Sequence, residues 1–509
     1  MWNSTGFDSA CKCYSECIGN IQTDCLASQK YYHFVRLMGR SASHIALECA
    51  LQCHPNMCLI GEEVAAQSLT PRDVASQIAD VIAARAVEGK HYGTILVPEG
   101  LIEFFPAVQT LITEINDALG SGTEATAEAL SEVLSVESYD TLSSLPSEIQ
   151  LQLILDRDPH GNVQVSAIET EALLISMAGA ILAERRKAGT YSGSFPAGAQ
   201  SHFLGYEGRS LPPTLFDSSY CYGLGHVAGL LVRQRLNGFI AVLRNLNRPV
   251  NEWLPGGIPL TSMMCVERRL GQEKPVIRKA LVELEQEPFL SYVALRDGWA
   301  AGDHFRNPGP IQYAGAAGQG TNFTLASTDR SLAAGAVRHM VAESGLYAPV
   351  AVKLGTHLES KFACWKSPTN LSPLQAQRLA TPPECPAVLS MSSFSLLQGC
   401  GLKMLESPQQ LENALNDAFP ATSQQNVIEL QRSDPRVPLE PSVTAHQTTP
   451  LRIGVVFCGR QNPAGHNIIA VRVFLSVYAV FYRFMLFYAV LCCFFLSWYA
   501  VFVLKMIDL

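Results

Sequence analysis

Residues 31–44, YYHFVRLMGRSASH, contain an apolar run that stops at Gly39 and Arg40 and is followed by small polar residues. Such a run predicts a buried β-strand that ends in a turn. In open α/β sheets, ligands bind outside the carboxyl ends of the strands, and an arginine side chain pairs well with phosphate oxygens. The stretch therefore predicts an anion-binding strand end.

The residues that follow continue an α/β pattern. We expect a helix near residues 44–52, a short strand at MCLIGE, a helix opened by Thr70 and Pro71, and a strand at GTILVPEG. Proline at the first helical position and Asp73 in the first turn are typical of a helix start. Together these elements predict βαβ units.

Composition restricts the class of protein. The chain has 509 residues, 48% of them hydrophobic, and a net charge of −8, so it can fill the cores of two to three domains and does not present a nucleic-acid surface. No secretion signal precedes the first residues, which indicates a reducing cytosol. Zinc is not expected, because the densest cysteine group lacks paired CxxC spacing or histidine partners: Cys11, Cys13, Cys17 and Cys25.

The later sequence changes character several times. Amphipathic runs in 101–195 predict a helical insertion, and the strand and helix pattern of the sheet resumes at about 200. Proline-rich sequence then predicts loops and a linker. The segments we expect are 1–100 and 196–366 as one α/β domain, 101–195 as its insertion, 367–450 as the loop-rich linker, 451–470 as the start of a second domain and 471–509 as a hydrophobic tail.

Phe484 to Leu504 is an uncharged run long enough to span a bilayer. Two interpretations compete: a C-terminal transmembrane helix, or sequence foreign to the fold, such as translated non-coding sequence. We favour the second. A membrane partner is expected only if the run is genuine.

Two further motifs end in residues suited to a sugar phosphate. LVPEG places Glu99 at a strand end, where a carboxylate can accept hydrogen bonds from sugar hydroxyls. In GYEGR, Tyr206 and Arg209 flank Gly208, which lets backbone approach a ligand closely.

The MGR, PEG and YEGR motifs, in this order, resemble the phosphofructokinase family, most closely its pyrophosphate-dependent long form. Segments such as FLGYEGRSLPPTLFD, GGIPLTSMMCVERR and DHFRNPGPIQY look like that family as well. The resemblance implies a three-layer Rossmann-like α/β fold. It also implies magnesium-dependent phosphoryl transfer from pyrophosphate to fructose 6-phosphate in glycolysis, and an oligomer whose site is shared across a dimer interface.

The resemblance also implies roles for individual residues. The MGR residues contact the sugar phosphate, the PEG glutamate binds sugar hydroxyls, the YEGR residues hold the 6-phosphate, and a Lys-Tyr pair reaches the site of a neighbouring subunit. In this order the expected substrate-binding residues are Met38, Gly39, Arg40, Glu99, Tyr206, Glu207, Gly208, Arg209, Lys30 and Tyr31.

The sequence departs from the family pattern in its chemistry. The glycine-aspartate loops that carry pyrophosphate, magnesium and the base aspartate would lie before Met1, so we expect neither a catalytic residue nor a metal ligand in this sequence. LRIGVVFCGRQNPAGHN resembles the start of a second phosphofructokinase copy. Two alternatives stay open: an ATP-dependent 6-phosphofructokinase, and a non-catalytic regulatory subunit that binds sugar phosphate.

Overall fold

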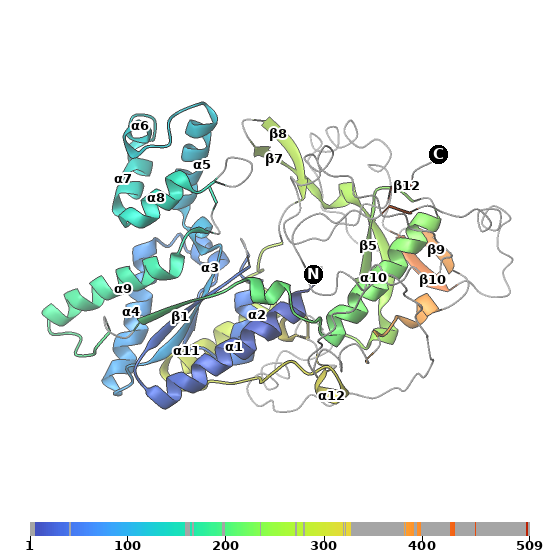
Figure 1. Cartoon of the computed structure of the whole chain (residues 1–509), viewed down its shortest axis with the longest axis horizontal. Helices are drawn as coiled ribbons and strands as arrows, with labels where there is room; N and C mark the ends of the chain where they lie inside the picture. The colour runs from blue at the N-terminus through green and yellow to red at the C-terminus, as the bar shows by residue number, and fades with distance from the viewer. Residues whose placement is uncertain are drawn as a thin grey trace, which may run out of the picture.

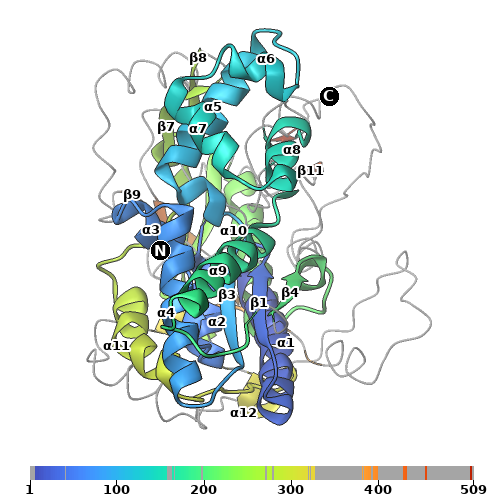
Figure 2. The same cartoon turned by 90° about the vertical axis from the view of Figure 1, so that its left-hand side faces the viewer.

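A computed structural model gives the architecture of the chain (Figures 1 and 2). Arg40 and the apolar run at 484–504 lie outside the residues that it describes. The described residues are 6–39, 42–157, 163–164, 167–195, 199–234, 236–269, 272–277, 280–318, 320, 322–326, 381, 383–390, 394–398, 428–432, 453–454 and 505–506.

The apolar run of residues 31–44 forms, within the described part of the chain, one of the two inner strands of a four-stranded parallel sheet. In the described residues the strand order is β2-β3-β1-β4, and β1 pairs in parallel with both of its neighbours. Tyr32 lies opposite Gly93 on one side and Ala199 on the other. The strands are β1 (Tyr32–Leu37), β2 (Met57–Cys58), β3 (Gly93–Pro98) and β4 (Ala199–Leu204).

Helices cover both faces of this sheet, as Figure 2 shows. Alternate residues of β1 point to opposite sides: Phe34 packs in the cluster that contains α4 and α9, and Val35 packs in the cluster that contains α1, α2 and α11. The expected three-layer α/β fold is therefore present. The covering helices are α1 (Phe7–Ser28), α2 (His44–Cys53), α3 (Gly61–Ala66), α4 (Pro71–Val87), α9 (Thr170–Lys187), α11 (Glu287–Ala301) and α13 (Phe323–Ala326).

Helix α4 begins as the sequence predicts. The Thr70 hydroxyl accepts a hydrogen bond from the Asp73 N–H, and the Asp73 carboxylate accepts one from the Thr70 N–H, which makes a capping box. Gly89 follows the helix with φ of 74°, a conformation that glycine adopts without strain. The chain then turns back into β3.

The predicted insertion is helical and projects from the sheet in Figure 1. It begins after β3 with η1 (Leu101–Phe104) and continues through α5 (Pro106–Gly120), α6 (Ala127–Ser131), α7 (Val136–Ser144) and α8 (Ser147–Leu155). Helix α9, which we placed in the same insertion, instead packs against α4 and the sheet. Helix α9 therefore belongs to the helix layer that covers the parallel sheet, because its apolar residues Leu173, Leu174 and Leu182 are buried in the core cluster on that face.

The expectation that the sheet resumes at about 200 holds for β4 but is wrong for the strand after it. Strand β5 starts a second, antiparallel sheet with order β5-β6-β10-β9, against which α10 packs. Its elements are α10 (Leu215–Arg233), β5 (Phe239–Arg244), β6 (Leu254–Pro259), β9 (Phe394–Gln398), β10 (Ile428–Arg432) and η6 (Ala387–Ser390). The remaining short elements are η3 (Tyr206–Arg209), η4 (Val250–Glu252), η5 (Leu260–Met263), β7 (Met264–Arg269), β8 (Gln272–Ile277), α12 (Gly315–Gly318), β11 (Ile453–Gly454) and β12 (Lys505–Met506).

Within the described ranges, no helix has both the length and the apolar character needed to cross a bilayer.

Candidate functional site

The predicted motifs follow the carboxyl ends of three parallel strands, so they lie at the same edge of the first sheet. β3 leads to Glu99, β1 leads to Met38 and Gly39, and β4 leads to the YEGR segment. The Met38 N–H donates to the Leu204 carbonyl at 2.9 Å, and the Glu99 N–H donates to the Leu37 carbonyl at 3.0 Å. The structure thus brings together motifs that are far apart in the sequence.

Glu99 acts directly on the turn after β1. Its side chain is 2% exposed, and its Oε2 accepts a hydrogen bond of 3.1 Å from the Gly39 N–H. A hydrogen bond between a backbone N–H and a buried carboxylate is strong, so it restricts the position of both groups. Glu99 therefore holds the Gly39 backbone just after the end of β1.

The YEGR segment forms the short helix η3 beside this turn. Glu207 folds back, so that its Oε2 accepts from the Gly205 N–H at 2.7 Å. The Arg209 guanidinium lies 5.4 Å from the centre of the Tyr206 ring, and Tyr206 is 56% exposed. A cation supported by an aromatic face at an exposed edge can receive an anionic ligand.

Tyr14 of α1 anchors η3, and the sequence analysis missed it. Its hydroxyl donates to the Gly205 carbonyl, and a Cβ on Gly208 would lie 2.5 Å from the Tyr14 hydroxyl oxygen. Burial raises the pKa of Tyr14 above its usual range, which keeps the phenol protonated as a donor. The helical spacing of Phe7, Tyr14 and Ile18 in FDSACKCYSECIGN was the available signal.

Lys30 and Tyr31 do not join this edge. They precede β1, at the opposite end of the strand from Gly39. The Tyr31 carbonyl accepts from the Gly93 N–H at 3.1 Å, and the Tyr31 ring lies 6.4 Å from the His33 ring. Within one chain, therefore, the pair is separated from the other predicted residues by the length of β1.

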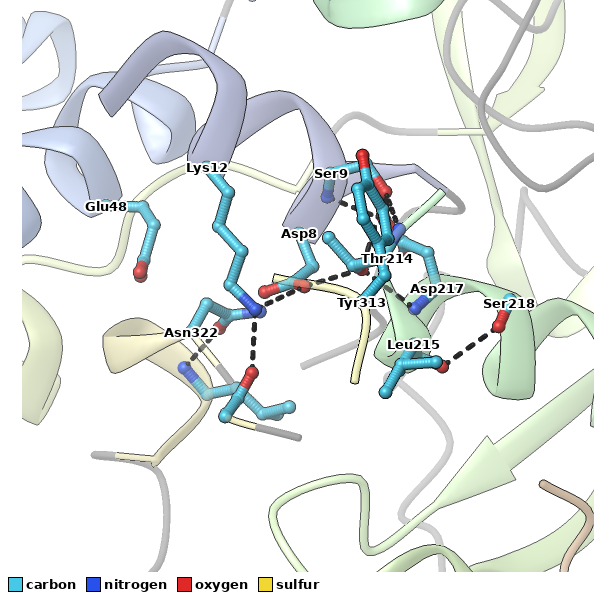
Figure 3. Close-up of polar contacts among 12 residues, drawn as sticks. Asp8, Ser9, Lys12, Glu48, Thr214, Leu215, Asp217, Ser218, Tyr313 and Asn322 are labelled. Carbon is cyan, nitrogen blue, oxygen red and sulfur yellow. Dashed lines mark hydrogen bonds and ion pairs between the residues drawn. The ribbon is translucent and has the colours of Figure 1, made fainter. Parts of the chain in front are cut away.

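A buried polar cluster joins α1 to α10 just beyond η3 (Figure 3). Asp217 accepts from the Gly6 N–H at 3.2 Å, the Ser9 N–H at 2.7 Å and the Ser9 hydroxyl at 2.6 Å. Asp8 Oδ2 accepts from the Thr214 hydroxyl at 2.7 Å and from Lys12 Nζ at 2.9 Å. The YEGR segment is thus attached to α1 at both of its ends: Tyr14 bonds to Gly205 before it, and Asp8 and Ser9 bond to Thr214 and Asp217 after it.

This cluster predicts a pH dependence of stability. Burial, followed by the charge of Asp8, raises the pKa of Asp217 to about 7. The folded protein therefore holds the proton more tightly than the unfolded chain, whose Asp pKa is about 4. The stabilisation is complete below pH of about 4 and is lost as the pH rises to about 7, so we expect the free energy of unfolding to fall across that window.

Denaturant titrations at several pH values measure this effect. The Asp217→Asn variant, which has no proton to lose at this position, should show a smaller decrease from pH 4 to pH 7 than the parent protein. Equal slopes in the two proteins would contradict the assignment to Asp217.

Two carboxylates lie at the same edge of the sheet. Glu99 and Glu207 both accept hydrogen bonds from backbone N–H groups. In the part of the chain that the structure describes, no three His, Cys, Asp or Glu side chains come together as a metal site requires.

Several known proteins are similar to this chain. The family model "Phosphofructokinase" matches residues 2–142. Pyrophosphate–fructose 6-phosphate 1-phosphotransferase subunit beta of Ricinus communis is 52% identical over 322 residues, which are 63% of this chain and 58% of that protein. The enzyme of that name from Treponema pallidum (strain Nichols) is 50% identical over 321 residues, 61% of this chain and 56% of that protein.

A relative named as the other subunit type is also similar. Subunit alpha 1 of Arabidopsis thaliana is 43% identical over 324 residues, 61% of this chain and 52% of that protein. The chain thus spans little more than half the length of the curated relatives it matches. Over these stretches the chain is similar to the phosphofructokinase family.

Proposed function

We propose that the edge formed by Met38, Gly39, Glu99 and the YEGR segment binds fructose 6-phosphate in a pyrophosphate-dependent phosphofructokinase. The reaction is transfer of a phosphoryl group from pyrophosphate to the 1-hydroxyl of that sugar phosphate. The observation that carries the proposal is the meeting of three motifs at one strand edge, with Gly39 bonded to Glu99. The names of the relatives support the choice of pyrophosphate over ATP.

The residues of this edge bind and orient the substrate. Arg209 pairs with the 6-phosphate, and Tyr206 supports its guanidinium from one side. The hydrogen bond from Gly39 to Glu99 holds the backbone after β1 in place beside the substrate. Phosphoryl transfer depends largely on such positioning of the acceptor hydroxyl. The cofactor expected for the family is magnesium, for which no group of three His, Cys, Asp or Glu side chains occurs in the described residues.

Assembly with other subunits is part of the proposal. Relatives named as alpha and beta subunits suggest a hetero-oligomer. Lys30 and Tyr31, at the far end of β1, would then face a neighbouring subunit and complete its site. We place the enzyme in the cytoplasm and in glycolysis. A regulatory subunit that binds the sugar phosphate without turnover would use the same edge, so binding and turnover must be measured separately.

We expect Arg209→Ala in the full chain to weaken fructose 6-phosphate binding by at least about tenfold. A charged hydrogen bond contributes about 1.5–3 kcal/mol, and 1.4 kcal/mol corresponds to a factor of ten. Isothermal titration calorimetry measures the dissociation constant with or without turnover, so it tests the site in either kind of subunit.

The matched control is Arg72→Ala, because the Arg72 side chain is 74% exposed at the start of α4 and pairs with Glu184 of α9 at 3.8 Å. It should leave the dissociation constant unchanged. If Arg209→Ala binds as tightly as the parent protein, the sugar-phosphate assignment of this edge fails.

A further inference from the structure

Two cysteines that the proposed function does not use share one face of α1. Cys13 and Cys17 are one helical turn apart, a spacing that puts their Cβ atoms about 5–6 Å from each other. Both are free thiols and half-buried. The other described thiols of α1, α2 and β2 are buried: Cys11, Cys25, Cys49, Cys53 and Cys58. Among the thiols of these three elements, solvent therefore reaches Cys13 and Cys17.

The pair is unequal. A hydrogen bond from the Cys13 thiol lowers the pKa of Cys17 to about 7, in spite of burial and of the charges of Glu16 and Glu207. The same hydrogen bond, followed by burial, raises the pKa of Cys13. Since the thiolate is the reactive form of cysteine, Cys17 is the nucleophile and Cys13 is its hydrogen-bond donor.

The pair also lies beside the candidate site. Tyr14, next to Cys13 in the same helix, donates to the Gly205 carbonyl and packs against Gly208. The charge of Glu207 acts on both thiols. A group attached to Cys17 would thus stand next to the contact between α1 and η3.

We propose that Cys17 is an oxidative modification site, at which a peroxide oxidises the thiolate and a small-molecule thiol then caps it, loosening the contact between α1 and η3. In the first step the Cys17 sulfur attacks one peroxide oxygen, the O–O bond breaks, and hydroxide leaves with Cys17 as the sulfenic acid. In the second step the small thiol forms the S–S bond and water leaves. A further molecule of that thiol reduces the mixed disulfide and regenerates Cys17.

An intrahelical disulfide with Cys13 is disfavoured by geometry. A disulfide needs Cβ atoms about 3.5–4.5 Å apart, less than the separation of one turn in a regular helix. The capped form is consequently the expected product. The chemistry at Cys17 stands independently of the proposed function, whereas its effect on sugar-phosphate binding rests on that function.

Site-resolved mass spectrometry of the full chain tests the reactivity. With hydrogen peroxide and a sulfenic-acid trap at pH 7, we expect labelling of Cys17 to be at least about tenfold faster than that of Cys385, a half-buried thiol whose pKa burial raises to about 12. Cys13→Ala should slow the labelling of Cys17 about tenfold, and Cys13→Ser, which keeps a donor hydroxyl, should restore most of the rate. Equal labelling of Cys17 and Cys385, or no effect of Cys13→Ala, would overturn the proposal.

Hydrogen exchange tests the structural consequence. After peroxide and glutathione, we expect faster exchange in the peptide that contains residues 205–209 and no change in β3, with Cys17→Ser as the unmodified control. Unchanged exchange at 205–209 would refute the loosening. The capped protein should also bind fructose 6-phosphate more weakly. If the uncapped protein does not bind it at all, the proposed function fails while the labelling and exchange results still decide the modification.

Discussion

Replacing Asp217 by alanine is expected to lower the free energy of unfolding by about 3–5 kcal/mol at pH 6. Helix α1 has glycine before its first turn and so lacks a side-chain cap of its own. Asp217 of α10 supplies that cap, accepting from the N–H groups of Gly6 and Ser9 and from the Ser9 hydroxyl. Alanine would leave these donors buried without an acceptor.

Ser218→Ala is the matched control for this prediction. Ser218 is the next residue of the same helix and is also buried, but its hydroxyl donates only to the Leu215 carbonyl one turn earlier, at 3.1 Å (Figure 3). Its loss should cost about 1 kcal/mol or less. Equilibrium denaturation of both variants measures the difference, and similar stabilities would show that Asp217 does not cap α1.

Arg85→Ala is the second large effect, with an expected loss of about 3–5 kcal/mol. Arg85 is 1% exposed, and its guanidinium donates to the carbonyls of Tyr92 and of Ala300, Ala301 and Gly302, where α11 ends. It also pairs with Asp303 at 2.7 Å. Loss of the cation leaves the carbonyls at the negative end of the helix dipole without their donor.

Lys90→Ala is the control for Arg85→Ala, because it also removes a positive charge from the end of α11 but leaves the buried hydrogen bonds of Arg85 in place. Lys90 approaches the same helix end, at 3.3 Å from the Ala301 carbonyl and 3.8 Å from Asp303, but it is 26% exposed. Exposed pairs contribute about 1 kcal/mol or less, so this variant should remain close to the parent protein. Thermal melting of both variants is sufficient, and an Arg85→Ala protein as stable as Lys90→Ala would contradict the role of Arg85.

The sequence predicted what depends on local pattern. The apolar run before Gly39 is strand β1, Thr70 and Asp73 open α4, and the motif after β4 lies beside the turn after β1. These features follow from hydrophobic period, capping chemistry and the rule that parallel strands end at one edge. The grouping of the three motifs as one substrate site, by contrast, is what the resemblance to the phosphofructokinase family implies.

The pairing of strands that are far apart in the chain could not be predicted from the sequence. β5 pairs with β6, and the same antiparallel sheet continues through the distant strands at 428–432 and 394–398. Nothing in the run GFIAVLRNL distinguishes such a sheet from a continuing parallel one. The bond from Tyr14 to Gly205 and the cap that Asp217 provides are also contacts between distant segments. Local pattern can mark Tyr14 as a buried helix residue, but it does not identify these partners, because each contact forms only after the two segments have met.

The position of β4 beside β1 has a consequence for how the chain folds. β1 can pair with β3 soon after both are made, but β4 reaches β1 only after the chain has passed through the helices α5 to α9. Closing so long a loop is entropically costly before the pairing can repay it, and non-local pairing slows folding. We therefore expect the helices between β3 and β4 to form early, and the candidate site, which needs the end of β4, to be assembled among the last parts of the domain.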